Sequence, residues 1–111
     1  MNWNTLTDEK QLDAIKEESK QHPVVIFKHS TRCAISSMAK NRLERDEQSP
    51  GISFYYLDLL SYRPISNKIA EEFQVQHESP QILLIKGGQC VYDESQNGIN
   101  MSDIIEQGRI S

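Results

Sequence analysis

The stretch VVIFKHSTRCAISSMAKNRL, residues 24–43, joins a continuous apolar run to a segment with helical periodicity. Its first four residues are apolar and largely β-branched, which is typical of a strand buried on both faces of a sheet. After a polar stretch, Ile35, Ala39 and Leu43 return at helical spacing. The sequence therefore predicts a central parallel strand followed by an amphipathic helix that opens close to Cys33.

The neighbouring segments predict further helices and strands. Thr7 is a candidate N-cap for a first helix from about Asp8 to Lys20, which Pro23 ends. The helix that opens near Cys33 is broken by the turn residues 49–51. Residues 52–60 are rich in β-branched and aromatic side chains and predict a strand. A helix with Pro64 in its first turn follows.

A hairpin and a last helix complete the chain. Gln81–Ile85 and Cys90–Tyr92 flank Gly87 and Gly88, which can both take positive φ, so an antiparallel hairpin is predicted. Strand alternation would place Cys90 on the same face as Tyr92. The last helix begins near Asn100 or Ser102.

The order of these elements predicts the architecture. Helix, strand, helix, strand, helix, strand, strand, helix combines a right-handed βαβ unit with a ββα unit. With 111 residues, of which 37% are hydrophobic and 25% charged, the chain fits one compact domain, residues 1–111. We expect an α/β, thioredoxin-like three-layer α/β/α sandwich with a central mixed β-sheet.

Composition excludes several classes of function. The net charge is −4 and no basic run is interleaved with aromatic residues, so we expect no nucleic-acid partner. No segment approaches the roughly 20 apolar residues needed to cross a bilayer, and the N-terminus lacks a secretory pattern, so no membrane role is expected. Two cysteines and three scattered histidines predict no metal site and suit a reducing, cytoplasmic location.

Cys33 is the candidate catalytic residue. Unpaired N–H groups and the macrodipole at a helix N-terminus stabilise an anion there, and Arg32, Lys28 and His29 supply nearby cationic groups in the sequence. Cysteines in such surroundings have pKa values lowered from about 8.5 to between roughly 3.5 and 7.5. The alternative is a small apolar filler, but a filler does not need this position.

The fourth position of the motif decides the mechanism. Dithiol oxidoreductases resolve a mixed disulfide with a second cysteine, whereas Cys33 is followed three residues later by Ser36. Cys33 would therefore take a small thiol from a mixed disulfide and wait for an external thiol to remove it. The hydroxyl or N–H of Ser36 could reach the sulfur.

Other residues around the motif are candidates for tuning the thiolate or for contacting the thiol. They are His29, Thr31, Arg32, Ile35 and Ser36. For His29 a solvated loop position is an open alternative, while His22 and His77 are interpreted as structural.

The dipeptide Ser79-Pro80 precedes the hairpin and is the second candidate site. X–Pro bonds are the common sites of cis peptides. A cis bond here would turn the chain and present the backbone of Ser79 to an extended substrate. An ordinary trans proline at a strand start is the alternative. Cys90 is interpreted as structural, with a distant resolving thiol as the alternative.

Residues 29–36, residues 77–81 and the late Gly98-Ile99-Asn100 together resemble the YtxJ family of monothiol bacilliredoxins. The resemblance implies a thioredoxin fold and an enzyme that removes bacillithiol from S-thiolated cytoplasmic proteins through Cys33. It also implies bacillithiol as a low-molecular-weight co-substrate, with no tightly bound cofactor. Ala34 departs from the family pattern, which has proline there, and so restores an N–H in the first helical turn.

Two other functions compete with disulfide exchange. A redox-inactive thioredoxin-fold module could hold an extended peptide in a groove at Ser79-Pro80. An iron–sulfur assembly site is less favoured because residues 34 and 35 lack the glycine of the Cys-Gly-Phe-Ser pattern. The reactivity of the Cys33 thiol separates exchange from simple binding.

Overall fold

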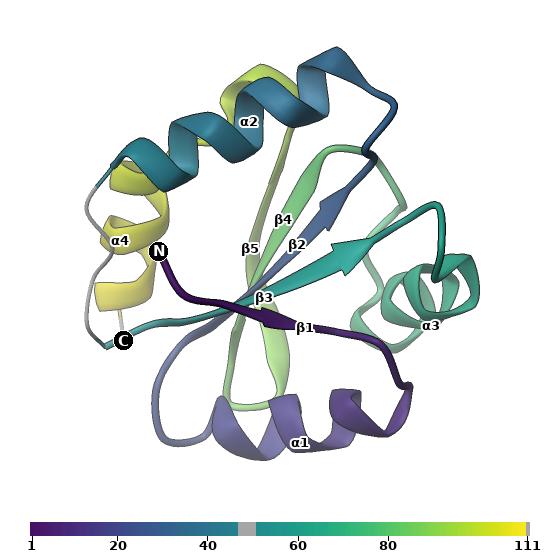
Figure 1. Cartoon of the computed structure of the whole chain (residues 1–111). Helices are drawn as coiled ribbons and strands as arrows, with labels where there is room; N and C mark the ends of the chain where they lie inside the picture. Colours follow the sequence, from purple (N-terminus) through teal and green to yellow (C-terminus); the bar gives the residue numbers. More distant parts are fainter. Residues whose placement is uncertain (47–50, 111) are drawn as a thin grey trace.

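The computed structural model describes residues 1–46 and 51–110 and contains a five-stranded mixed sheet of order β1-β3-β2-β4-β5 (Figure 1). β2 lies at the centre, parallel to β3 and antiparallel to β4, as the apolar run predicts. The elements in chain order are β1 (Trp3–Thr5), α1 (Lys10–Glu18), β2 (Val24–His29), α2 (Ala34–Arg45), β3 (Ser53–Asp58), α3 (Arg63–Phe73), β4 (Gln81–Lys86), β5 (Gln89–Ser95), the 3-10 helix η1 (Gln96–Gly98) and α4 (Met101–Arg109).

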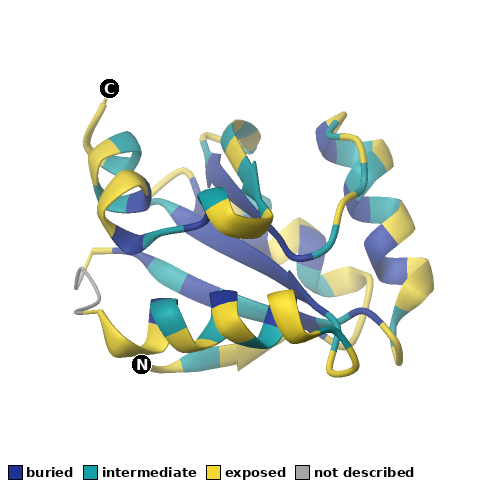
Figure 2. Cartoon of the chain, turned by 90° about the horizontal axis from the view of Figure 1, so that it is seen from above, coloured by how far each residue is buried: buried dark blue, intermediate teal, exposed yellow. Residues whose placement is uncertain are grey.

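Helices cover both faces of the sheet, which confirms the predicted three layers. α1 and α3 lie on one face, and α2 and α4 on the other (Figure 1). Successive residues of β2 enter opposite cores: Val24 and Ile26 pack with α1 and α3, while Val25 and Phe27 pack with α2 and α4. Every residue of β2 is buried, and the central strands form a dark blue band in Figure 2.

Several local predictions are confirmed. Gly87 and Gly88 have φ values of 60° and 79° and join β4 to β5 as an antiparallel hairpin. Asn100 is the N-cap of α4, because its side chain accepts a 2.9 Å hydrogen bond from the N–H of Asp103. Pro64 lies in the first turn of α3.

Other local predictions are wrong or incomplete. Thr7 does not cap α1; Asp8 Oδ1 instead accepts from the N–H of Lys10 at 2.9 Å. β1 was not predicted, because three residues carry too short a pattern, yet it pairs in parallel with β3. α2 ends at Arg45, and the predicted breakers Ser49 and Pro50 lie outside the described residues.

The predicted shared face of Cys90 and Tyr92 is also wrong. Leu84 pairs with Tyr92, and the next residue, Ile85, pairs with Cys90, so Val91 is an extra residue in β5. Such a bulge shifts the alternation of side chains by one position. Cys90 therefore packs against the α1 and α3 core, and Tyr92 against the α2 and α4 core.

No helix within the described ranges 1–46 and 51–110 is long and apolar enough to cross a membrane.

The central strands should dominate the stability of the fold. Leu83 in β4 is fully buried, so Leu83→Ala should lower the free energy of unfolding by about 2–5 kcal/mol. Val91 in the same hairpin is 52% exposed, and Val91→Ala should change the free energy of unfolding by no more than about 0.5 kcal/mol. Urea unfolding followed by circular dichroism measures both, and equal effects would contradict this account of the core.

Candidate functional site

The candidate site lies at the edge of the sheet where β2 ends and β4 begins. β2 and β4 are antiparallel, and Lys28 near the end of β2 pairs with Gln81, the first residue of β4. The connection from β2 to α2 contains Cys33, and the loop entering β4 contains Ser79 and Pro80. The pairing therefore brings two segments that are far apart in the sequence to one edge.

Cys33 lies at the N-terminus of α2, as predicted, and the structure makes it the N-cap residue. Its backbone is extended, with φ −108° and ψ 120°, and its C=O accepts a 3.0 Å hydrogen bond from the N–H of Ser37. Its N–H donates to the C=O of Ser30 at 3.2 Å, which closes the loop before the helix. The residue is half-buried and is not sealed in apolar packing. Cys33 directly precedes the helical N–H groups that lack intrahelical partners, and its side chain makes no capping hydrogen bond.

Ser36 is fully buried, and its hydroxyl is engaged away from the sulfur. Ser36 Oγ lies 2.6 Å from His29 Nδ1 and accepts a 3.0 Å hydrogen bond from the N–H of Ser30. Because the oxygen accepts from Ser30, its hydrogen is available to donate to His29. Within the described part of the chain, no hydrogen bond joins the Ser36 side chain to Cys33. The expected contact between the Ser36 hydroxyl and the Cys33 sulfur is therefore not formed.

His29 is the last residue of β2 and is only 4% exposed, so the alternative of a solvated loop residue is wrong. Its ring stacks on Phe27, with centroids 5.7 Å apart, and lies 5.5 Å from the ring of Tyr56. Burial lowers the pKa of His29, and the nearby Lys40 cation lowers it further. Ser36 fixes the orientation of the imidazole from the α2 side.

The remaining candidates near the motif lie at the surface. Thr31 and Arg32 are exposed in the turn before Cys33, and Ile35 is 43% exposed in the first turn of α2. They form an accessible rim beside the cysteine in the chain.

Lys28 differs from its predicted place. It is fully buried, and its Nζ donates to the C=O of Ser66 and to His77 Nδ1, both at 3.3 Å. Strand alternation directs Lys28 to the face opposite His29. Its ammonium therefore contacts α3 and the loop that follows α3, and not the Cys33 segment. Sequence reasoning missed this cluster because it ended the strand at Phe27; the one available signal was a lysine two residues after Ile26.

The Ser79–Pro80 peptide bond is cis, as predicted. Pro80 is buried, and its C=O accepts a 3.0 Å hydrogen bond from the N–H of Gln96. In contrast, neither the backbone N–H nor the backbone C=O of Ser79 has a hydrogen-bond partner among residues 1–46 and 51–110. Ser79 Oγ is also buried without a partner in this part of the chain. The backbone of Ser79 is therefore available to another chain.

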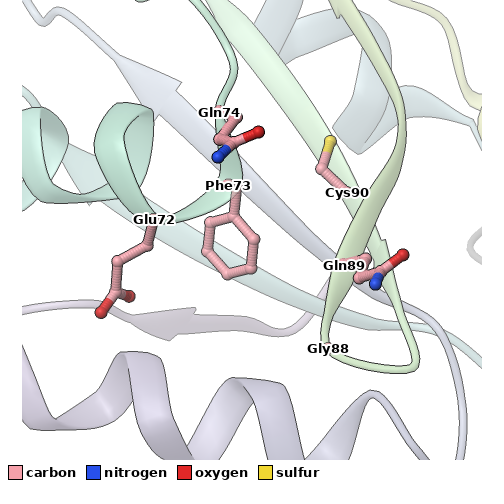
Figure 3. A pocket seen from close by; sticks show the side chains of 6 residues that line it. All are labelled: Glu72, Phe73, Gln74, Gly88, Gln89 and Cys90. Atoms are coloured by element: carbon pink, nitrogen blue, oxygen red, sulfur yellow. The ribbon is translucent and has the colours of Figure 1, made fainter.

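Cys90 lies at the opposite end of the sheet, where it lines a surface pocket of about 410 Å³ (Figure 3). Cys90 pairs with Ile85, and Ile85 pairs with Val24 at the start of β2. Val24 and His29, at the two ends of β2, are five residues apart, which corresponds to about 16 Å along the strand. A disulfide needs Cα atoms within about 7 Å, so this fold does not allow Cys90 to pair with Cys33. Burial raises the pKa of the Cys90 thiol to about 11. These features favour the structural interpretation.

Solved structures share this architecture. A thioredoxin-fold protein provisionally described as an oxidoreductase is 31% identical, with a TM-score of 0.78; the match covers 93% of this chain and 90% of that one. Thioredoxin from Fasciola hepatica is 19% identical, with a TM-score of 0.70 and 93% of each chain covered. Thioredoxin from Malassezia sympodialis is 18% identical, with a TM-score of 0.71, and the match covers 95% of this chain and 86% of that one. The chain has the thioredoxin-like fold.

The model of one protein family matches nearly the whole chain. Residues 4–104 match the family described as "Monothiol bacilliredoxin BrxC". Membership implies thiol–disulfide oxidoreductase activity and the involvement of bacillithiol. The matched range includes both the Cys33 segment and the Ser79-Pro80 segment, and the sequence resemblance is confirmed. This chain belongs to the monothiol bacilliredoxin BrxC family.

Proposed function

We propose that this chain removes bacillithiol from S-bacillithiolated cytoplasmic proteins by monothiol disulfide exchange at Cys33. The observation that carries the proposal is the half-buried Cys33 at the N-cap of α2, with no second cysteine within disulfide reach among the described residues. Ser36 occupies the position of a resolving cysteine, and Cys90 lies at the far end of the sheet. The family membership supports bacillithiol as the co-substrate, without a tightly bound cofactor.

The reaction has two exchange steps. In the first, the Cys33 thiolate attacks the bacillithiol sulfur of the mixed disulfide. The substrate S–S bond breaks, a Cys33–bacillithiol disulfide forms, and the protein cysteine leaves as a thiolate. In the second, an external thiolate attacks the bacillithiol sulfur and releases Cys33. One disulfide is consumed and one is formed in each step, so no further oxidant or reductant takes part.

Each part of the site has a role in this scheme. Cys33, at the N-terminus of α2, is the nucleophile in the first step and the leaving group in the second. The exposed Arg32 adds positive charge beside it, and Thr31 and Ile35 form the rim that meets the thiol. The free backbone N–H and C=O of Ser79, fixed by the buried Pro80, pair with the extended chain of the substrate.

The choice of cysteine can be tested by intact-mass spectrometry after incubation with oxidised bacillithiol. We expect the wild-type protein to gain one bacillithiol adduct, located on Cys33. Cys33→Ser should form no adduct and should reduce removal of bacillithiol from a mixed-disulfide protein to the uncatalysed rate. Cys90→Ser is the matched control and should retain both properties, because the Cys90 thiol is half-buried and protonated.

An adduct found on Cys90 alone, or a Cys33→Ser protein that still removes bacillithiol, would contradict the proposal. A Cys33 that forms no adduct in a folded protein, while an extended peptide still binds near Ser79, would instead favour the redox-inactive binding module.

The monothiol scheme needs no chemistry from Ser36, which leads to a second prediction. Ser36→Ala removes the bonds to His29 Nδ1 and to the Ser30 N–H and leaves one buried group and one half-buried group unpaired. Its free energy of unfolding should fall by about 1–3 kcal/mol, while the adduct on Cys33 still forms. Urea unfolding and intact mass measure the two effects.

Ser37→Ala is a suitable control, since the neighbouring Ser37 side chain is only half-buried, and it should change the free energy of unfolding by no more than about 0.5 kcal/mol. Complete loss of the Cys33 adduct in a folded Ser36→Ala protein would show that the serine takes part in the chemistry and would contradict the scheme.

A further inference from the structure

A buried lysine lies beneath the loop that enters β4. Lys28 is 0% exposed on the face of β2 that packs against α1 and α3. Its Nζ donates to the C=O of Ser66 on α3 and to Nδ1 of His77 in the loop. Ser66 Oγ also lies 3.3 Å from the same nitrogen of His77. Lys28 therefore ties the loop to both the sheet and α3.

Stability alone does not explain a lysine at this position. Burial lowers the pKa of Lys28 to about 8, which records the cost of removing the ammonium from water. No carboxylate among residues 1–46 and 51–110 forms an ion pair with it. A methionine would fill similar space without this desolvation cost, but it would not reach the C=O of Ser66 or Nδ1 of His77.

A second buried polar side chain holds the same loop from the neighbouring strand. Gln81 pairs with Lys28 in the sheet and is 1% exposed. Its Nε2 donates to the C=O of Gln76 at 3.0 Å, and its Oε1 accepts from the N–H of Glu78 at 3.4 Å. Lys28 and Gln81 thus bind residues 76–78, which directly precede the unpaired backbone of Ser79.

We propose that Lys28 is a positioning residue for protein substrates: together with Gln81 it holds residues 76–78 so that the backbone of Ser79 is kept ready to pair with an extended chain. This inference rests on the function proposed above. The ammonium acts through the loop and does not touch the reacting sulfur atoms. Its effect should therefore depend on whether the substrate has a backbone that can pair with Ser79.

Two substrates that share the same disulfide test this dependence. One is a ten-residue extended peptide whose single cysteine carries bacillithiol, and the other is the mixed disulfide of bacillithiol with free cysteine. Only the peptide offers backbone groups on both sides of the disulfide. We expect Lys28→Met to raise KM for the peptide about tenfold with kcat within twofold. For the cysteine mixed disulfide, kcat/KM should stay within twofold of wild type.

Two further variants complete the experiment. Ile26→Met alters the same face of the same strand without touching the loop contacts and should leave both substrates unaffected. Gln81→Leu removes the other support and should raise the peptide KM in the same way as Lys28→Met. Urea unfolding should show that Lys28→Met folds with a midpoint close to that of wild type, because the relieved desolvation of the ammonium offsets the two lost hydrogen bonds. A KM change limited to the peptide then separates a positioning role from a structural one.

The outcomes distinguish this inference from the proposed function. The positioning role is overturned if Lys28→Met has an unchanged KM for the peptide, or if its kcat/KM falls equally for both substrates. In either case, turnover by the wild-type protein still supports the proposed exchange activity. If Lys28→Met does not fold, an unchanged peptide KM in Gln81→Leu overturns it. A wild-type protein that reacts with neither substrate overturns the proposed function and this inference together.

Discussion

The antiparallel pairing of β2 with β4 is the constraint on which the site depends. Because the two strands run in opposite directions, the end of one and the start of the other share an edge of the sheet. Cys33 follows the first, and Ser79 precedes the second. Burial of both faces of β2 fixes this register, since a slip by one residue would exchange the two cores. The apolar packing of β2 thus brings the Cys33 and Ser79 segments to one edge of the sheet.

Side-chain alternation along β2 divides its last two residues between different tasks. His29 enters the α2 side, where Ser36 and the aromatic rings hold it under the cysteine loop. Lys28 enters the other side and reaches the loop before Ser79. One strand end therefore supports both halves of the site, each through a buried polar side chain with its own hydrogen-bond partners. This arrangement explains why polar residues follow the apolar run without a break in the strand.

The features that sequence predicted have strong local causes. A continuous apolar run that is largely β-branched favours a buried strand. Two adjacent glycines permit the hairpin turn, and Asn100 supplies an N-cap oxygen. The features that it missed depend on tertiary contacts. β1 is too short to carry a pattern, and the direction of Lys28 depends on whether the strand ends at Phe27 or His29. The partner of Ser36 could not be read from spacing, because His29 and Cys33 are both close to it in the chain.

The bulge at Val91 has a consequence for the reactivity of Cys90. The extra residue turns the second sulfur inward, where it donates to the C=O of Tyr92 at 3.4 Å and is half-buried. With a pKa of about 11, roughly one Cys90 side chain in ten thousand is ionised at pH 7. Peroxides and disulfides react with thiolates, so Cys90 reacts slowly with them at this pH. A one-residue irregularity in an edge strand thus keeps the Cys90 sulfur against the α1 and α3 core and in its unreactive thiol form.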